Sequence, residues 1–236
     1  MERTKKRSKF WDKEYLKAER LAIARTPSED LQKFCRFLER HYGRQYLHQN
    51  CKVLDAGCGN GRNLIFLAQE YGMHGLGIDS SLEGIEQARK HAKEVEVSHL
   101  VTFQKGSISD PLPLPDHTTT LVLDMMVSHV LKSYERDSFL KEIVRVLRTD
   151  GWLFFKTFLL DEDRNAKRLL RDNPGSEEGS YIHPDIGVEE HVFTEHEIAE
   201  LLEPYFILHK IAPSHKHLKY GQANKRRSVS VYAQVK

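Results

Sequence analysis

The segment Val53–Asn63 constrains the fold most, because a strand, a glycine turn and a helix start follow one another directly. An apolar run from Cys51 ends in Asp55-Ala-Gly, and glycines then alternate at positions 57, 59 and 61. Glycine lets a backbone turn tightly and lets a ligand lie against it. A new helix offers free N–H groups at its positive end. The segment therefore predicts a ligand-binding strand–turn–helix unit.

Strands and helices alternate along the rest of the chain. Apolar runs predict strands at 51–56, 74–79, 100–105, 120–124, 152–158, 205–211 and 228–235. Helical spacing predicts helices at 60–71, 81–95, 136–147 and 194–202, and Asp150-Gly151 reads as a turn. Such alternation predicts an α/β fold, a Rossmann-like doubly wound sheet that is mostly parallel, with helices on both faces.

Two segments lie outside this alternation. We expect residues 1–48 to form a helical N-terminal extension. Its first nine residues should be frayed, a helix should run from 10 to about 24, and Ser28 should cap a second helix after Pro27. Residues 49–236 form the main predicted domain. Within it, residues 159–192 are polar with few strand signals, and long excursions of this kind are usually functional or mobile. We expect this segment to be an insertion on the substrate side.

Composition excludes several classes of protein. The formal net charge of +2 is too small to indicate a nucleic-acid partner by itself. The three cysteines include no C-x-x-C pair, which argues against a disulfide framework. No apolar run approaches the roughly 20 residues that span a bilayer, and no apolar stretch follows the basic N-terminus as in a signal peptide. We expect a cytoplasmic protein without a membrane partner.

Two acidic residues indicate the ligand of the glycine turn. Asp79 ends the second strand, where a carboxylate can accept bonds from both hydroxyls of a ribose. The dinucleotide pattern is G-x-G-x-x-G, whereas this turn is G-x-G-x-G and is preceded by Asp55. A carboxylate beside the turn favours a ligand with a cationic amine and a sulfonium over a pyrophosphate. This favours S-adenosylmethionine over a nicotinamide dinucleotide.

The whole core resembles the class I S-adenosylmethionine-dependent methyltransferases. The resemblance rests on Asp55-Ala-Gly-Cys-Gly-Asn-Gly, Leu76-Gly-Ile-Asp79, Phe103-Gln-Lys-Gly-Ser-Ile108, Pro113-Leu-Pro-Asp116, Leu121-Val-Leu-Asp124 and Leu147-Arg-Thr-Asp-Gly151. These segments follow the family's order over about 51–158. The resemblance implies a sheet of about seven strands with an antiparallel last strand, and an N-terminal lid.

The resemblance also implies the cofactor site. It assigns binding to Asp55, Gly57, Cys58, Gly59, Asn63, Asp79, Ser80, Ser107, Ile108, Asp124 and Met125. Asp55 and two glycines would line the methionine part, Asp79 would hold the ribose, and Ser107 with Ile108 would flank the adenine. Asp124 and Met125 would lie near the sulfonium. The product of the reaction would be S-adenosyl-L-homocysteine.

Candidates for catalysis are fewer. His129 follows the fourth strand and Glu190 precedes the helix that Thr194 caps, and either could act as a general base. The simpler readings are a structural histidine and a solvated acidic loop. His209, His215 and His217 have no acid or cysteine at ligand spacing, so no metal site is expected. Lys225-Arg226-Arg227, with Lys216 and Lys219, predicts a solvated turn or a phosphate contact.

The sequence therefore predicts a methyltransferase acting on a small molecule, since no nucleic-acid-binding module is appended to the compact core. Three alternatives stay open. The basic chain ends favour a methyltransferase for RNA or protein, a binding protein could sense S-adenosylmethionine without turnover, and a nicotinamide-dependent reductase is the last alternative. Neither the acceptor nor the oligomeric state follows from these residues.

Overall fold

The computed structural model describes residues 2–17, 24–214 and 226–236, with side chains from residue 9 onward. The strands are β1 (Lys52–Ala56), β2 (His74–Asp79), β3 (Val101–Lys105), β4 (Thr119–Met125), β5 (Leu147–Phe158), β6 (Ser180–Ile182), β7 (Glu189–His191), β8 (Phe206–Pro213) and β9 (Ser228–Val235). The helices are α1 (Glu2–Lys17), α2 (Glu29–Tyr42), α3 (Arg62–Tyr71), α4 (Leu82–Glu94), the short 3-10 helix η1 (Ser128–Val130), α5 (Ser133–Val146), α6 (Arg164–Asp172) and α7 (Glu195–Leu202).

Seven strands form one sheet in the order β3-β2-β1-β4-β5-β9-β8. Neighbours from β3 to β5 pair in parallel, and β9 runs antiparallel between β5 and β8. The predicted doubly wound sheet with an antiparallel last strand is thus confirmed. The strand order reverses between β1 and β4, and ligands of such sheets bind beyond the carboxyl ends of the strands at that point.

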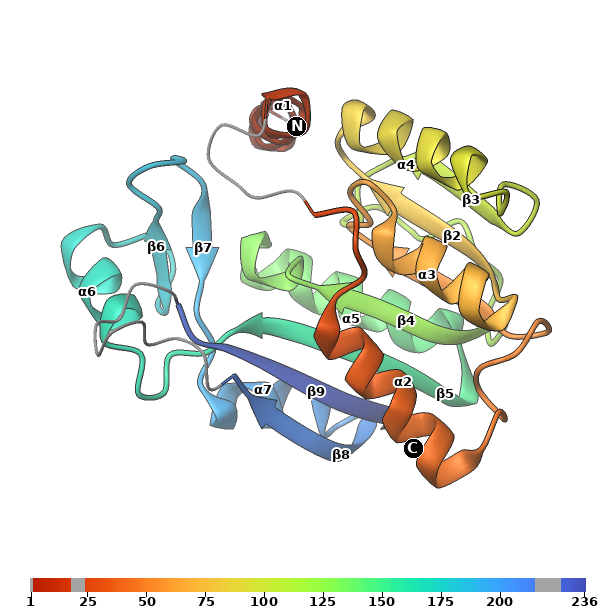
Figure 1. Ribbon diagram of the computed structural model, residues 1–236. Coiled ribbons are helices and arrows are strands. Elements are labelled where there is room, and N and C mark those ends of the chain that lie inside the picture. Colours follow the sequence, from red (N-terminus) through yellow and green to blue (C-terminus); the bar gives the residue numbers. More distant parts are fainter. Residues whose placement is uncertain (1, 18–23, 215–225) are drawn as a thin grey trace.

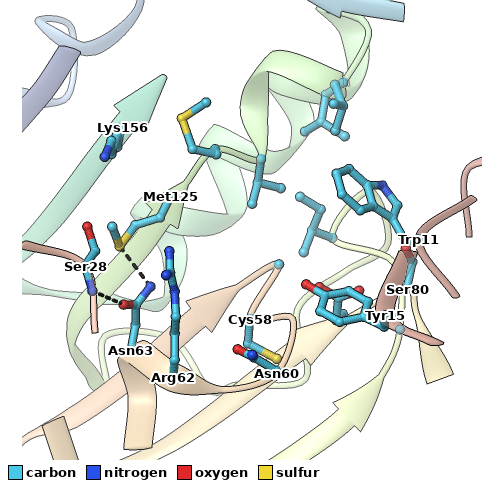
Figure 2. Close-up of a pocket in the computed structure, with 18 of the residues that line it drawn as sticks. Trp11, Tyr15, Ser28, Cys58, Asn60, Arg62, Asn63, Ser80, Met125 and Lys156 are labelled. Carbon is cyan, nitrogen blue, oxygen red and sulfur yellow. Dashed lines mark hydrogen bonds between the residues drawn. The ribbon is translucent and has the colours of Figure 1, made fainter. Parts of the chain in front are cut away.

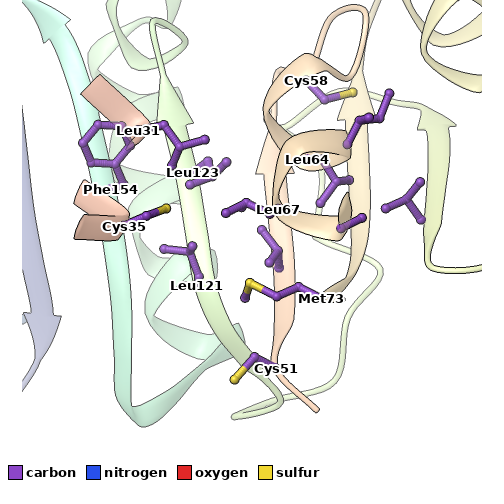
Figure 3. Packing of buried hydrophobic residues seen from close by; sticks show 14 of the residues in the cluster. Leu31, Cys35, Cys51, Cys58, Leu64, Leu67, Met73, Leu121, Leu123 and Phe154 are labelled. Carbon is purple, nitrogen blue, oxygen red and sulfur yellow. The ribbon is translucent and has the colours of Figure 1, made fainter. Parts of the chain in front are cut away.

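Helices cover both faces of the sheet (Figure 1). α2, α3 and α4 lie on one face, where their apolar residues join those of β1, β4 and β5 in one buried cluster. Figure 3 shows Leu67 of α3 facing Leu121 and Leu123 of β4, whereas Leu64 lies on the side of Gly75 in β2. α5 and α7 pack on the other face in a second cluster. Burial on both faces explains why the central strands read as unbroken apolar runs.

α2 is part of the main core although it precedes the first strand. Its ring of Phe34 stacks on Phe154 with the centroids 5.0 Å apart, and the centroid of Tyr232 is 4.8 Å away. Leu31 and Phe34 are fully buried. Because residues three and four apart share one face of a helix, the periodicity that predicted α2 also identified its buried side. α2 therefore anchors the residue before it, Ser28, which leads into the site.

Several predicted boundaries are wrong. α1 begins at Glu2, where fraying was expected, and ends at Lys17; residues 18–23 lie outside the described part. α5 begins at Ser133 instead of Arg136. The expected turn at Asp150-Gly151 lies inside β5. There Arg148 bonds the Asp150 carboxylate, and the register with β4 shifts, so extended backbone absorbs the extra residues.

Residues 159–192 contain more regular structure than their composition predicted. They hold α6 and the two-stranded sheet of β6 and β7. Tyr181 is fully buried there, in a small cluster with Ala166, Leu169 and Val192. Three-residue strands contain too few alternating positions to be recognised from sequence. Figure 1 shows this unit beside the carboxyl ends of β4 and β5.

Candidate active site

The turn after β1 depends on glycine at three positions. Gly57, Gly59 and Gly61 all have positive φ angles, of 68°, 54° and 75°. A Cβ on Gly57 would collide with Val127, one on Gly59 with the Tyr15 hydroxyl, and one on Gly61 would lie 2.7 Å from the Phe103 ring. Residues with a side chain disfavour positive φ angles, and a side chain at these positions would also clash with the neighbouring residues. The turn is therefore held close to its neighbours.

Asp79 links the turn to the end of β2. Its carboxylate accepts from the backbone N–H of Gly59 at 2.9 Å and from that of Ser81 at 2.8 Å. Burial is the largest cause that raises its pKa, while these backbone bonds oppose the rise. Each carboxylate oxygen retains acceptor capacity beyond one bond. Asp79 can therefore accept two further hydroxyl groups.

Asp55 is buried in the last part of β1 with 2% of its surface exposed. Its Oδ2 atom has no hydrogen-bond partner among the described residues. Burial, and then the charge of Asp79, raise the pKa of this carboxyl to about 7. A buried acid of this kind attracts a cation, because an opposite charge restores the stability that desolvation removes.

A cavity of about 410 Å³ lies at the carboxyl ends of β1, β2 and β4. Eight of the eleven predicted cofactor residues line it, namely Gly57, Cys58, Asn63, Asp79, Ser80, Ser107, Ile108 and Met125. Figure 2 shows Asn63 bonded to both Ser28 and Met125. Asp55, Gly59 and Asp124 do not line the cavity. Asp124 instead accepts from the backbone N–H and the hydroxyl of Ser128.

α1 covers one end of this cavity. Trp11 and Tyr15 line it, opposite Ser28 and Lys156 in Figure 2. Asp12 accepts from the Ser81 hydroxyl at 2.6 Å, and Gln87 donates to the backbone oxygen of Tyr15 at 2.7 Å. These bonds attach α1 to the N-terminal half of α4.

Comparison with known proteins agrees with this geometry. Residues 53–151 match a protein family described as a methyltransferase domain. The arsenite methyltransferase of Aquipseudomonas alcaligenes is 33% identical over 145 residues, which cover 56% of this chain and 41% of that enzyme. The crystal structure of a SAM-dependent methyltransferase from Methanosarcina mazei is 27% identical, with a TM-score of 0.68, covering 81% of this chain and 95% of that one.

Residues 53–151 thus form a methyltransferase domain, and the seven-stranded sheet around them has the fold of the class I S-adenosylmethionine-dependent methyltransferases. A fatty-acid O-methyltransferase from Mycolicibacterium smegmatis is a further relative, 28% identical over 57% of this chain and 47% of its own length. The matched region thus spans less than half of each of these two curated relatives. The residues present fit the methyltransferase cofactor, because Asp55 has an oxygen without a partner beside a cradle that only glycine can form.

Sequence reasoning missed several residues that line the methyltransferase cavity. They are Ser28, Asn60, Arg62, Met126, Val127, Val130, Leu131 and Lys156. One signal was present, since Lys156 is the single charged residue in the apolar run Trp152–Phe158. Its position pairs with Met125 across β4 and β5, which brings it to the cavity. A lysine in a buried strand is rarely placed without a function or a partner.

His129 and Glu190 meet, but away from the cavity lining. His129 Nε2 lies 3.6 Å from Glu190 Oε1, and both residues are almost fully buried. Burial lowers the pKa of His129, which outweighs the opposing effect of Glu190. Val130 and Leu131, the next residues, line the cavity. The catalytic role of this pair stays a prediction.

The basic run before β9 is not the expected solvated turn where it is described. Arg226 is buried with 9% of its side chain exposed, and it bonds Glu190 at 2.6 Å. Arg227 bonds the Asp161 backbone oxygen and Glu162. Lys225, Lys216 and Lys219, together with His215 and His217, lie outside the described residues. Acids of the 159–192 segment, the buried Glu190 and the exposed Glu162, account for the difference, because sequence spacing could not pair them with these arginines.

No helix in the described ranges is long and apolar enough to cross a membrane. Over the same ranges, no three metal-ligating side chains gather into one group.

The raised pKa of Asp55 predicts a pH-dependent stability. Between about pH 4 and pH 7 the folded protein holds a proton that the unfolded chain releases. The free energy of unfolding contributed by this carboxyl is full below that window and is lost as the pH rises through about 7. The loss is at most about 1.4 kcal/mol per pH unit. Asp55→Asn should therefore gain stability relative to the wild type as pH rises, measured by urea unfolding.

Asp137→Asn is the matched control, because Asp137 is an exposed acid on α5. It should follow the wild-type pH dependence. If the free energy of unfolding changed with pH in the same way for the wild type and Asp55→Asn, the assignment of a raised pKa to Asp55 would be contradicted.

Proposed function

We propose that this protein transfers a methyl group from S-adenosylmethionine to a small-molecule acceptor. The observation that carries the proposal is the cavity in which the glycine turn, Asp79 and Met125 meet at the strand ends. The names of two relatives support a small acceptor, since one enzyme is named for arsenite and the other for a fatty acid.

The chain's own residues have distinct tasks in this proposal. Asp79 accepts the ribose hydroxyls, and Asp55 compensates the positive charge of the methionine part. Ser107 and Ile108 hold the adenine. The bound cofactor supplies an activated methyl group, so the protein has to align the acceptor in line with it and exclude water. Alignment of this kind contributes roughly 7 to 11 kcal/mol to lowering a barrier.

A general base is required only for an acceptor that is protonated at the working pH. His129 and Glu190 are our candidates for that role. Their mutual contact and burial support a base whose proton affinity is tuned by its surroundings, as catalytic residues require. Val130 and Leu131 line the cavity, whereas His129 and Glu190 do not. A thiolate or another soft anion is an acceptor that would need neither residue as a base.

We also propose roles for the two segments outside the regular alternation. Within residues 1–48, α1 acts as a lid, supported by Trp11 and Tyr15 over the cavity and by the bonds of Asp12 to α4, whereas α2 belongs to the core. Residues 159–192 form an insertion on the acceptor side, supported by the contacts of β7 with η1. The domain proper then comprises residues 49–236 together with α2, which packs in the same core.

Loss of the Asp79 carboxylate should abolish tight cofactor binding. Two bonds from hydroxyls to a charged acceptor contribute about 1.5 kcal/mol or more each. Asp79→Ala should therefore raise the dissociation constant of S-adenosylhomocysteine about 100-fold or more. Isothermal titration calorimetry measures this change. Asp137→Ala should bind S-adenosylhomocysteine as the wild type does. Asp79→Asn removes the negative charge without leaving the empty space that alanine creates. Wild-type affinity in Asp79→Ala would reject the ribose assignment.

Closure of the lid should change the environment of Trp11. The protein has two tryptophans, and Trp152 is fully buried in the sheet core. Adding S-adenosylhomocysteine should therefore reduce acrylamide quenching of Trp11 fluorescence. In Trp11→Phe the remaining signal should not respond. Quenching of the wild type that is unaffected by the ligand would count against a lid.

Labelled methyl transfer identifies the class of acceptor. The protein is incubated with methyl-labelled S-adenosylmethionine and cell extract separated into small molecules, RNA and protein. We expect the label in the small-molecule fraction, and none with Asp79→Ala. Label in RNA or protein would favour the macromolecular alternative, with RNA binding that weakens steeply as salt rises. Cofactor binding without transfer to any fraction would favour a sensor.

A further inference from the structure

A second cavity, of about 800 Å³, adjoins the cofactor cavity on the α2 face of the sheet. Ser28, Arg62 and Lys156 line both cavities. In Figure 2 these three residues lie at the end away from Trp11 and Tyr15. The ribose acceptor Asp79 and its neighbour Ser80 belong to the first cavity alone. The second cavity therefore opens where an acceptor, rather than the nucleoside, would lie.

The described wall of this second cavity is positively charged. Its cations come from five different elements or loops and are Lys33, Arg62, Lys156, Lys210 and Arg226. Its carboxylates are Glu29 and Asp30. Asp30 bonds Lys156 at 2.7 Å and Lys33 at 2.9 Å. Five cations face two carboxylates on the wall, and Glu190 behind the wall pairs with Arg226, so an excess of two positive charges remains at this space.

Hydroxyl groups complete the polar lining. Ser228 and Ser230 of β9, with Ser214 after β8, lie on the wall together with Lys210. Ser214 Oγ accepts from the Ser228 backbone N–H at 3.1 Å, which leaves its hydroxyl proton as a donor. Cations joined by hydroxyl donors are the chemistry that holds a carboxylate or phosphate.

Arg226 is held in place by the 159–192 insertion. Glu190 of β7 bonds its guanidinium at 2.6 Å, and the same carboxylate oxygen accepts from the Tyr181 hydroxyl of β6 at 2.6 Å. The guanidinium also stacks on Phe158, with its central carbon 3.2 Å from the ring centroid. Stacking and a carboxylate fix the orientation of an arginine, which lowers the entropy that an anion would lose on binding it.

We propose that the second cavity binds the anionic group of the methyl acceptor, a carboxylate or a phosphate, through Lys210, Arg226 and the neighbouring serines. This inference rests on the proposed methyltransferase function and names the acceptor class. Glu190 and Tyr181 act as positioning residues for Arg226. The insertion thereby selects the substrate without touching the methyl group, and Lys156 lies at the junction of the two cavities.

Three probes with the same eight-carbon chain test the charge requirement, namely octyl phosphate, octanoate and octanol. Each is titrated calorimetrically into the full-length protein, with and without S-adenosylhomocysteine. An anionic probe should bind about tenfold or more tightly than octanol, as one charge-assisted bond predicts. The tighter of octyl phosphate and octanoate identifies the anion. Equal binding of octanol and both anions would overturn the proposal.

Two variants locate the site. Lys210→Gln, at an exposed position on β8, should weaken binding of the preferred anion about fivefold. Arg226→Gln should weaken it about tenfold or more, with partial rescue by Arg226→Lys. Lys141→Gln, an exposed lysine on α5, is the matched control. Unchanged anion affinity in Lys210→Gln and Arg226→Gln would also overturn the proposal.

The same samples separate this inference from the proposed function. Binding of S-adenosylhomocysteine should be equal in the wild type, Lys210→Gln and Arg226→Gln, because none of these changes alters Asp79 or the glycine turn. Failure of the wild type to bind S-adenosylhomocysteine would reject the methyltransferase site. Normal cofactor binding without a preference for anions would reject the anion site alone.

Discussion

The site depends on one steric constraint, the left-handed glycine turn between β1 and α3. With side chains excluded at Gly57, Gly59 and Gly61, the rings of Tyr15 and Phe103 and the side chain of Val127 can approach the backbone. The turn then presents the start of α3 to the cavity. Tyr15 of α1, Phe103 of β3 and Val127 after β4 therefore pack against one short stretch of backbone.

Burial of acids beside that turn costs stability when the chain is alone. Asp55 and Asp79 both have pKa values raised mainly by desolvation, and Asp55 retains an oxygen without a partner in the described structure. Proteins keep such groups where a ligand supplies the missing charge or bond. The second cavity has the opposite character, with positive charge in excess. The molecule thus separates an acidic cofactor end from a basic end along the same strand termini.

Prediction from sequence succeeded where a local pattern repeats. The strand at 74–79 and the Gly72 helix end occur as expected, because burial and the left-handed C-cap each leave a mark in consecutive residues. It failed for the three-residue strands β6 and β7 and for the extended backbone at Asp150. Lys156 was missed because its neighbour Met125 comes from another strand, and only the register of β4 and β5 brings them together.

By itself, the sequence determined the fold class, the glycine turn and eight of the residues that line the cofactor cavity. These depend on periodicity and on glycine spacing, which are properties of neighbouring residues. The tertiary structure alone decided that Glu190 binds Arg226, that Asp12 attaches α1 to α4, and that five cations surround a second cavity. Such contacts join residues far apart in the chain, and their geometry exists only after the sheet and its insertion have packed.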